Sequence, residues 1–274
     1  MGGVLNYMTG SHGRFVAKAL AIRAFAGALG FLTINAAYGA EAPVPARNVV
    51  LVHGAWADGS SWGEVIPRLQ AAGLKVTAVQ NPLTSLADSV AETRRVLAQQ
   101  DGPTVLVGHS WGGTVVSEAG TDPKVTALVY VAARAPDAGE DFVALSARFP
   151  TTPARAGVKE FEGFTTLSED AFLKDFANGV AERRAHALFA EQEPTAQSLF
   201  GGKTTQAAWH TKPSWYAVSK QDQTISPDLE RFLAKRMNAT TTEVDAGHLS
   251  LVSHSKEIAD IILAAAGRGK LAQR

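Results

Sequence analysis

Residues 104–113 read TVLVGHSWGG, and this stretch decides the fold class. An apolar run at 104–108 leads into Gly108-His109-Ser110-Trp111-Gly112, which fits G-x-S-x-G, and a helical run follows at 114–120. A turn this sharp forces strained backbone dihedrals at Ser110, and only glycine at 108 and 112 lets the strand and helix approach closely. The stretch therefore predicts a strand, a tight turn that presents a serine, and a helix.

Strand-like and helix-like runs alternate on both sides of this turn. We expect strands at 48–53, 75–80, 104–108, 125–133, 214–219 and 240–245. We expect helices at 61–73, 85–100, 114–120, 227–237 and 256–267. Ser85 is the expected N-cap of the second helix, with Asp88 three residues on. Alternation at this spacing predicts an α/β fold with a mostly parallel sheet.

The alternation stops between residues 136 and 208. Strand-like runs are missing there, and helical stretches carry eight of the 12 phenylalanines of the chain. We expect a core of residues 48–135 and 209–274, with 136–208 inserted as a helical cap.

The N-terminal segment differs from the rest in composition. Arg14, Lys18 and Arg23 precede an uncharged, alanine-rich stretch that ends in small residues. This order is typical of a secretory signal. We expect a signal peptide over 1–39, cleavage near Gly39 or Ala40, a linker at 40–47, and a periplasmic or secreted protein. An uncleaved membrane anchor, or a start at Met8, are the alternatives.

Composition excludes several classes of protein. The 26 basic and 26 acidic residues cancel, which argues against a nucleic-acid partner. Without cysteine there is no disulfide framework, thiolate zinc site or cysteine nucleophile. We expect neither a metal nor a cofactor, and the oligomeric state stays open.

Ser110 needs a base to remove its proton and a third group to orient that base. His248 follows the last predicted strand and Asp222 follows the strand before it, so both are expected at the sheet edge that carries Ser110. The predicted catalytic residues are Ser110, Asp222 and His248. His254 is the alternative base and Asp137 the alternative acid.

The loop after the first strand completes the predicted site. Backbone N–H groups of Ala55 and Trp111 are the expected oxyanion donors, whereas His53 and Gly54 shape the loop. We expect substrate contacts from Trp56, His109, Trp209 and Leu249, and Trp62 is a further aromatic candidate for an apolar pocket.

These residues lie in four blocks that resemble the α/β-hydrolase superfamily, in particular its branch of plant methylesterases, hydroxynitrile lyases and bacterial relatives. The blocks are VLVHGAWADGSSW (50–62), GHSWGG (108–113), KPSWYAVSKQDQTISPDLERF (212–232) and AGHLSLVSHSKEI (246–258). The resemblance implies an eight-stranded sheet, a helical cap over Ser110, a Ser-His-Asp triad, no cofactor, and a covalent acyl-enzyme.

The resemblance also separates candidate reactions. Cyanide-releasing members carry Thr where this chain has Gly54 and Lys where it has Leu249. We therefore expect a serine carboxylesterase for a small apolar or aromatic ester. The alternatives are a cofactor-free lyase and a ligand-binding receptor with vestigial turnover.

Overall fold

Six parallel strands form the central sheet of the computed structural model, which describes residues 45–269. The strand order is β2-β1-β3-β4-β8-β9, and every neighbouring pair is parallel. The strands are β1 (Asn48–Val52), β2 (Lys75–Val79), β3 (Thr104–His109), β4 (Val125–Val131), β8 (Ser214–Ser219) and β9 (Thr240–Val244). The predicted signal peptide and residues 40–44 of the linker lie outside the described residues.

The parallel α/β architecture is confirmed, but the expected number of eight strands is wrong for residues 45–269. The number eight came from the resemblance, whereas the apolar runs of the core predict six strands. Each of those runs forms one strand of the sheet within a few residues of its expected bounds. No seventh apolar run is present in the described core to extend the sheet.

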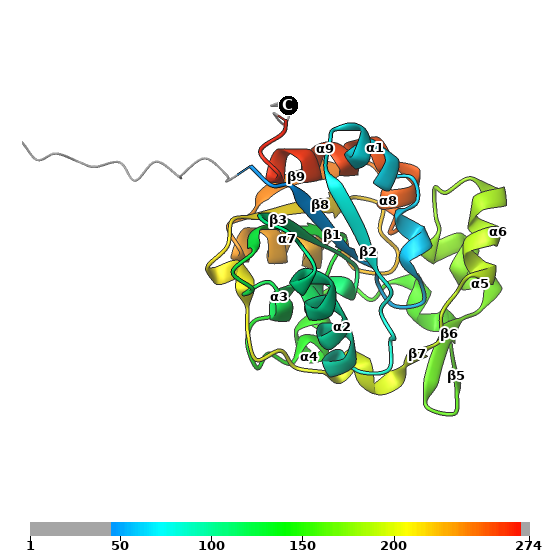
Figure 1. Ribbon diagram of the computed structural model, residues 1–274. Coiled ribbons are helices and arrows are strands. Elements are labelled where there is room, and N and C mark those ends of the chain that lie inside the picture. The colour runs from blue at the N-terminus through cyan, green and yellow to red at the C-terminus, as the bar shows by residue number, and fades with distance from the viewer. Residues whose placement is uncertain (1–44, 270–274) are drawn as a thin grey trace, which may run out of the picture. The chain divides into compact units, whose positions relative to one another are not determined.

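Helices cover both faces of this sheet. The pair α1 (Ile66–Ala71) and α9 (Ser255–Ala265) packs on one face, and α2 (Leu86–Ala98) and α3 (Gly112–Ala119) pack together on the other (Figure 1). The remaining core elements are α7 (Pro227–Arg236), which contacts β8, the short α8 (Ser250–Ser253), and the 3₁₀ turns η1 (Gly59–Trp62) and η5 (Ala208–His210).

Two helix starts follow local chemistry. The Ser85 side chain accepts a hydrogen bond from the Asp88 amide, so the predicted N-cap of α2 is confirmed. The helix expected over 61–73 is instead divided into η1 and α1. Proline in the first turn of α1 fixes its start, because proline has no N–H to contribute to a continuous helix.

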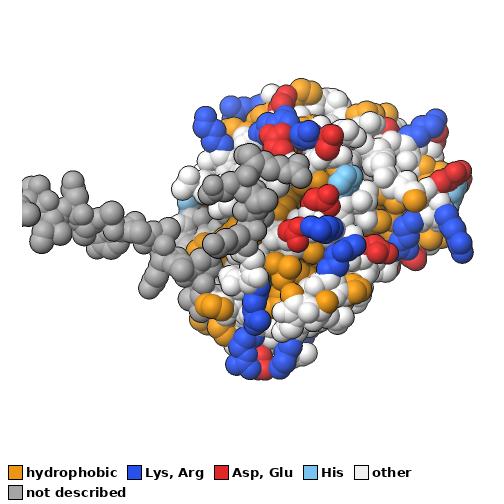
Figure 2. All heavy atoms as spheres, turned by 90° about the horizontal axis from the view of Figure 1, so that it is seen from above, with side chains coloured by type: hydrophobic (Ala, Val, Ile, Leu, Met, Phe, Trp, Pro, Cys, Tyr) orange, Lys and Arg blue, Asp and Glu red, His pale blue; other side chains and the backbone are white. Residues whose placement is uncertain are grey.

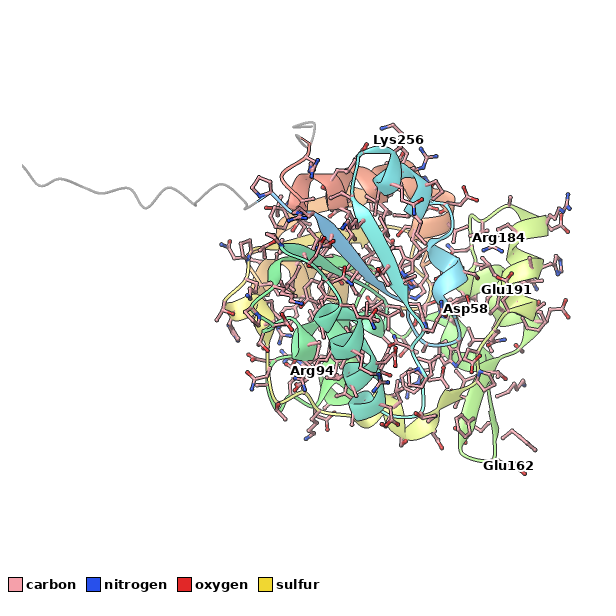
Figure 3. All side chains as sticks on the ribbon, viewed as in Figure 1. Asp58, Arg94, Glu162, Arg184, Glu191 and Lys256 are labelled. Atoms are coloured by element: carbon pink, nitrogen blue, oxygen red, sulfur yellow. The ribbon has the colours of Figure 1, made fainter. Side chains whose placement is uncertain are left out.

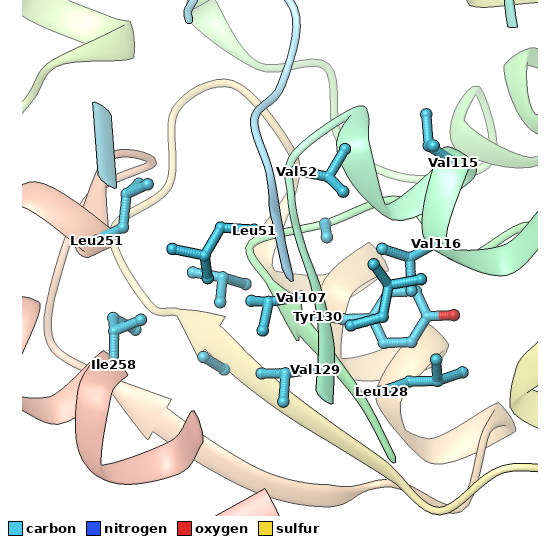
Figure 4. Packing of buried hydrophobic residues seen from close by; sticks show 14 of the residues in the cluster. Leu51, Val52, Val107, Val115, Val116, Leu128, Val129, Tyr130, Leu251 and Ile258 are labelled. Carbon is cyan, nitrogen blue, oxygen red and sulfur yellow. The ribbon is translucent and has the colours of Figure 1, made fainter. Parts of the chain in front are cut away.

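Alternate residues of the central strands supply the two layers of the core. In Figure 4, Leu51, Val107 and Val129 lie toward Leu251 and Ile258, whereas Leu128 and Tyr130 lie toward Val116 of α3. Both β1 and β3 are buried along their whole length, as expected for parallel strands covered on both faces. This packing fixes the carboxyl ends of the strands, where the predicted site lies.

The insertion between β4 and β8 is only partly helical. It contains a three-stranded antiparallel sheet, which corrects the prediction of a purely helical cap. Its strands are β5 (Val158–Phe161), β6 (Phe164–Leu167) and β7 (Thr195–Ala196). Its helical elements are α4 (Phe142–Ser146), η2 (Pro153–Gly157), α5 (Glu169–Ala171), η3 (Phe172–Phe176, π-helical), α6 (Glu182–Ala190) and η4 (Gln197–Gly201).

The hairpin of β5 and β6 has a turn that the sequence could have revealed. Glu162 and Gly163 both have positive φ, 48° and 82°, as a two-residue hairpin turn requires. Figure 3 shows Glu162 at the tip of this hairpin. Both strands are only four residues long, and β5 is largely exposed, so they lack the continuous apolar run that marks the core strands.

Polar contacts join the cap to the core. Ser60 Oγ donates to Glu191 Oε2 at 2.9 Å, and Arg184 Nη2 donates to the Ser60 carbonyl at 3.3 Å. Arg184 and Glu191 come from the cap and lie beside Asp58 of the core (Figure 3). These bonds hold α6 against η1.

Charged side chains of both signs are interspersed over the face shown in Figure 2, with apolar side chains between them. This face therefore has no large field of a single sign. None of the helices within residues 45–269 is long and apolar enough to cross a bilayer.

Candidate active site

Ser110 lies in the predicted sharp turn between β3 and α3. Its φ is +52°, so the expected backbone strain at this serine is confirmed. An added Cβ at Gly108 would stand 2.8 Å from the Gly112 backbone, and one at Gly112 would stand 2.6 Å from the Val52 carbonyl oxygen. Gly108 is required where the end of β3 meets the start of α3, and Gly112 is required where the start of α3 meets the end of β1.

Gly54 brings the loop after β1 against the serine. An added Cβ at Gly54 would stand 2.7 Å from Ser110 Cβ and 3.2 Å from Ser110 Oγ. Any side chain at residue 54 would therefore overlap the Ser110 side chain.

The predicted base and acid are in direct contact. His248 Nδ1 lies 2.6 Å from Asp222 Oδ2, and both side chains are fully buried. The other carboxylate oxygen, Oδ1, accepts hydrogen bonds from the backbone amides of Thr224 at 2.6 Å and Ile225 at 2.8 Å. These two amides fix the carboxylate so that Oδ2 faces the imidazole.

The alternative base and acid lie elsewhere. Asp137 pairs with His210, 3.0 Å away, and both side chains are exposed. His254 Nδ1 lies 3.0 Å from the hydroxyl of its neighbour Ser253. Neither residue contacts His248 or Asp222 among the hydrogen bonds of the described chain.

The second imidazole nitrogen of His248 is unused. Nε2 is buried and has no hydrogen-bond partner within residues 45–269, Ser110 Oγ included. The ring lies between His109 and Phe176, with ring centroids 4.7 Å and 5.1 Å away. Because Asp222 holds Nδ1–H, Nε2 is the nitrogen that can accept a proton.

Asn178, a cap residue that the sequence did not indicate, forms hydrogen bonds with the loops that carry Asp222 and His248. Asn178 Nδ2 donates to the Gln221 carbonyl at 2.8 Å, and its Oδ1 accepts from the His248 amide at 3.4 Å. An added Cβ at Gly247 would stand 2.1 Å from Asn178 Oδ1. Asn178 thus joins the loop of the acid to the loop of the base.

A second buried carboxyl group lies behind Asp222. Glu230 is fully buried, and its Oε2 accepts a hydrogen bond from the Ser219 amide at 2.9 Å. Burial raises the pKa of Glu230 well above its ordinary value, and the nearby Asp222 charge raises it further. Burial therefore favours the neutral, protonated form of Glu230.

The loop after β1 is held by His53. Its Nδ1–H donates to the Gly54 carbonyl at 2.9 Å, and its Nε2 accepts from the Asn81 amide at 2.8 Å. Burial lowers the pKa of His53, so the ring is neutral at pH 7. The prediction that His53 shapes this loop is confirmed.

The predicted oxyanion donors, Ala55 and Trp111, line the same cavity as Ser110. Neither backbone N–H donates to another group among the described residues. Trp111 immediately precedes α3, so its amide stands at the N-terminus of that helix. Two free donors beside the serine are what an oxyanion hole requires.

A cavity of about 670 Å³ opens beside Ser110. Its walls include Phe142, Phe149 and Phe200 from the cap and Arg134 from the end of β4. This volume is ordinary for a small-molecule site. Clusters of three or more side chains suited to metal binding are absent from residues 45–269.

Trp56 lines this cavity, as the sequence predicts. Its φ is +56°, and two cap threonines hold it in that strained position. The backbone amide donates to Thr195 Oγ1 at 3.0 Å, and the indole N–H donates to Thr165 Oγ1 at 3.1 Å. The small antiparallel sheet of the cap therefore fixes one wall of the cavity.

The other three residues predicted to contact substrate do not line this cavity. His109 is fully buried and lies 3.1 Å, through Nε2, from the His248 carbonyl oxygen. Trp209 donates its indole N–H to the Pro136 carbonyl at 2.9 Å. Leu249 borders a separate small void with Trp56 and Phe176. The place of these three residues in the sequence, beside a candidate catalytic residue or near a strand, does not determine whether their side chains line the cavity.

Arg134 is a cavity residue whose position in the sequence indicates the ligand-binding edge of the sheet. It ends the run VYVAAR, directly after the strand beside the one that carries Ser110. A charged residue at that strand end is expected at the ligand-binding edge of the sheet.

The site geometry and the sheet define a serine-centred α/β fold, and comparison with known proteins identifies the family. The model of the alpha/beta hydrolase family matches residues 49–261. The chain belongs to the α/β hydrolase family.

Its relatives include plant methylesterases, a hydroxynitrile lyase and bacterial esterases. The chain is 24% identical to methylesterase 8 of Arabidopsis thaliana over 258 residues, covering 81% of this chain and 90% of the relative. It is 22% identical to an α-hydroxynitrile lyase of the same plant, covering 80% and 97%. The crystal structure of a pyrethroid hydrolase from Sphingobium faniae JZ-2 superposes with a TM-score of 0.69, at 19% identity, covering 81% and 97%.

Proposed function

We propose that this protein is a serine carboxylesterase that acts through Ser110, His248 and Asp222. The observation that carries the proposal is the buried contact between His248 Nδ1 and Asp222 Oδ2 at 2.6 Å, which leaves Nε2 without a hydrogen-bond partner and able to accept a proton. Relatives named as methylesterases and a pyrethroid hydrolase support an ester as substrate.

In the acylation step, His248 Nε2 takes the proton of Ser110 Oγ as this oxygen attacks the ester carbonyl carbon. The carbonyl oxygen becomes an oxyanion, which the N–H groups of Ala55 and Trp111 stabilise. Asp222 keeps the proton of His248 on Nδ1 and stabilises the imidazolium that forms. His248 then gives its Nε2 proton to the departing alcohol, and the acyl group stays on Ser110.

In the deacylation step, water replaces the alcohol. His248 Nε2 takes a proton from water, and the resulting hydroxide equivalent attacks the acyl carbon. The same two N–H groups stabilise the second oxyanion. Collapse returns the proton to Ser110 Oγ and releases the carboxylic acid.

The cavity walls support a small ester with an apolar or aromatic part. Phe142, Phe149 and Phe200 form an apolar surface within the volume of about 670 Å³. Such walls bind carbon chains and rings through burial of apolar surface, while a few polar groups set orientation.

The lyase alternative is disfavoured because neither residue 54 nor residue 249 accommodates the side chain that lyases carry there. A threonine at residue 54 would place its Cβ 2.7 Å from Ser110 Cβ, so the loop after β1 would have to move. A lysine at residue 249 would replace a side chain that is 1% exposed, and burial of an unpaired ammonium group is costly.

Steady-state hydrolysis of short- and medium-chain p-nitrophenyl esters tests the proposal, with Ser110→Ala as the comparison. An esterase turns over many times per active site and loses this turnover in Ser110→Ala. A single turnover per site would favour the receptor alternative, and an absence of hydrolysis would refute the esterase proposal.

We also propose that the protein is exported and that the mature chain begins near Ala40. The support is the order of charged, apolar and small residues in the first 40 positions. N-terminal sequencing of protein recovered from the periplasm or medium tests this. A cell-associated product that retains residue 1 or residue 8 at its N-terminus would contradict it.

A further inference from the structure

The cavity beside Ser110 contains a buried positive charge that the proposed reaction does not use. Arg134 lines the cavity and is 8% exposed. The other charged side chains of the lining, Arg155 and Glu160, are exposed, and Glu160 Oε1 accepts a hydrogen bond from Gln197 at 2.8 Å. Arg134 is therefore the buried charge of the ester site.

The guanidinium of Arg134 has unused hydrogen-bonding capacity. Nη2 donates to the Phe200 carbonyl at 3.2 Å, whereas Nε is buried without a partner. Arg134 forms no ion pair within residues 45–269. By contrast, another partly buried arginine, Arg236, pairs with Glu140 at 2.7 Å. A guanidinium has five N–H donors, and only one hydrogen bond from this group is present within residues 45–269.

Arg134 stays charged despite its burial. Burial lowers the pKa of Arg134 to about 10, and the Asp141 carboxylate opposes this shift. The guanidinium carbon lies 4.2 Å from the centroid of the Phe142 ring, which partly stabilises the cation. Asp141 forms no ion pair with Arg134 within residues 45–269, and a buried cation without a direct ion-pair partner is costly to the folded protein, which points to a partner supplied by a ligand.

The backbone places this cation at the nucleophile. The Arg134 amide donates to the Ser110 carbonyl at 2.9 Å. The Arg134 carbonyl packs against Gly113, where an added Cβ would stand 2.1 Å from its oxygen. The elbow and the end of β4 are thus fixed together, and a molecule bound at Ser110 occupies the cavity that the guanidinium lines.

We propose that Arg134 binds a carboxylate of the substrate, so that the preferred substrate is an ester that also carries a free carboxylate. This inference rests on the proposed esterase function and replaces a wholly apolar ester with a half-ester. The planar guanidinium matches a carboxylate in a two-bond geometry. The phenylalanine walls accommodate the carbon chain or ring between the two ends.

A matched pair of methyl esters tests the inference. Monomethyl adipate carries a carboxylate, and methyl adipamate has a neutral carboxamide in its place. Their kcat/KM values are compared in the full chain, in Arg134→Gln, in Arg134→Lys, and in Arg148→Gln, which removes an exposed cap charge outside the cavity lining. The ratio of the two values within each protein is independent of the fraction that is active.

We expect the wild-type protein to prefer the carboxylate ester at least about tenfold, because a buried donor left unpaired is penalised. In Arg134→Gln the ratio falls to about 1 or lower, Arg134→Lys is intermediate, and Arg148→Gln keeps the wild-type ratio. A wild-type ratio of 1 or less, or an unchanged ratio in Arg134→Gln, would overturn the inference. A purely structural Arg134 would reduce stability without changing the ratio.

Binding separates failure of this inference from failure of the esterase proposal. Calorimetric titration of Ser110→Ala with the same two esters measures recognition without turnover. Tighter binding of monomethyl adipate, lost in Ser110→Ala/Arg134→Gln, supports the carboxylate site even if neither ester is hydrolysed. Equal binding of both esters would overturn the carboxylate site, including in a protein that hydrolyses esters.

Discussion

His248 and Asp222 share a buried contact of 2.6 Å between Nδ1 and Oδ2, and the other oxygen of Asp222 is occupied by two backbone amides. Those backbone N–H groups can only donate. If asparagine replaced Asp222, its side-chain oxygen would therefore face them, and its NH₂ group would face the imidazole. The contact therefore sets the tautomer of His248 as well as its position.

Asp222→Asn is expected to lower kcat by about 10³- to 10⁴-fold. The asparagine oxygen would accept from the Thr224 and Ile225 amides, leaving its NH₂ toward His248 Nδ1. The proton of the ring then moves to Nε2, which can no longer accept one from Ser110. Kinetics on a p-nitrophenyl ester measure this loss. Asp245→Asn, at an exposed aspartate after β9, is the control and should retain wild-type kcat.

Gly54→Ala is expected to lower kcat by about 100-fold or more, because the new Cβ would stand 2.7 Å from Ser110 Cβ and displace the nucleophile or the Ala55 donor. The matched control is Gly201→Ala, where an added Cβ meets nothing within 4 Å. Equal kcat in the two variants would show that the loop after β1 does not restrict the serine.

Glu230→Gln is expected to change how stability depends on pH. The raised pKa of Glu230 means that the folded protein holds a proton which the unfolded chain releases above the ordinary glutamate pKa. The contribution of Glu230 to the free energy of unfolding is fully present below the ordinary glutamate pKa. This contribution is lost as pH rises through the raised pKa of the folded protein. The loss has a slope of up to about 1.4 kcal/mol per pH unit.

Glutamine resembles the protonated acid and removes this loss. Denaturant unfolding between pH 5 and 8 should show a smaller decline in Glu230→Gln than in the wild-type protein. Glu162→Gln, at the exposed hairpin tip, should follow the wild-type decline (Figure 3). Parallel curves for wild type and Glu230→Gln would mean that Glu230 is ionised in the folded protein.

The sequence predicts the location of residues that are placed by the backbone, such as those in a tight turn or at the end of a strand. The strand before Ser110, the strained turn and the glycines at 108 and 112 follow from local sterics, and Asp222 and His248 follow from strand order. Periodicity of apolar runs gave the six core strands, whereas the number eight was taken over from other proteins and was wrong for residues 45–269.

Residues whose role depends on side-chain direction could not be predicted in this way. His109 and Leu249 are sequence neighbours of the proposed catalytic residues, yet both are buried and neither lines the cavity. Asn178 and Glu230 approach Asp222 and His248 only through tertiary packing, and no local sequence pattern marks them. The strands of the cap were missed because they are only two to four residues long and β5 is largely exposed, so they carry no long apolar run.

Labelling with a fluorophosphonate, read by intact mass and peptide mapping, tests whether Ser110 is an activated nucleophile. We expect one phosphonyl group per chain, located on Ser110, with labelling abolished in Ser110→Ala and slowed in Asp222→Asn. Absence of labelling in folded wild-type protein, or a label on another serine, would contradict Ser110 as the activated nucleophile.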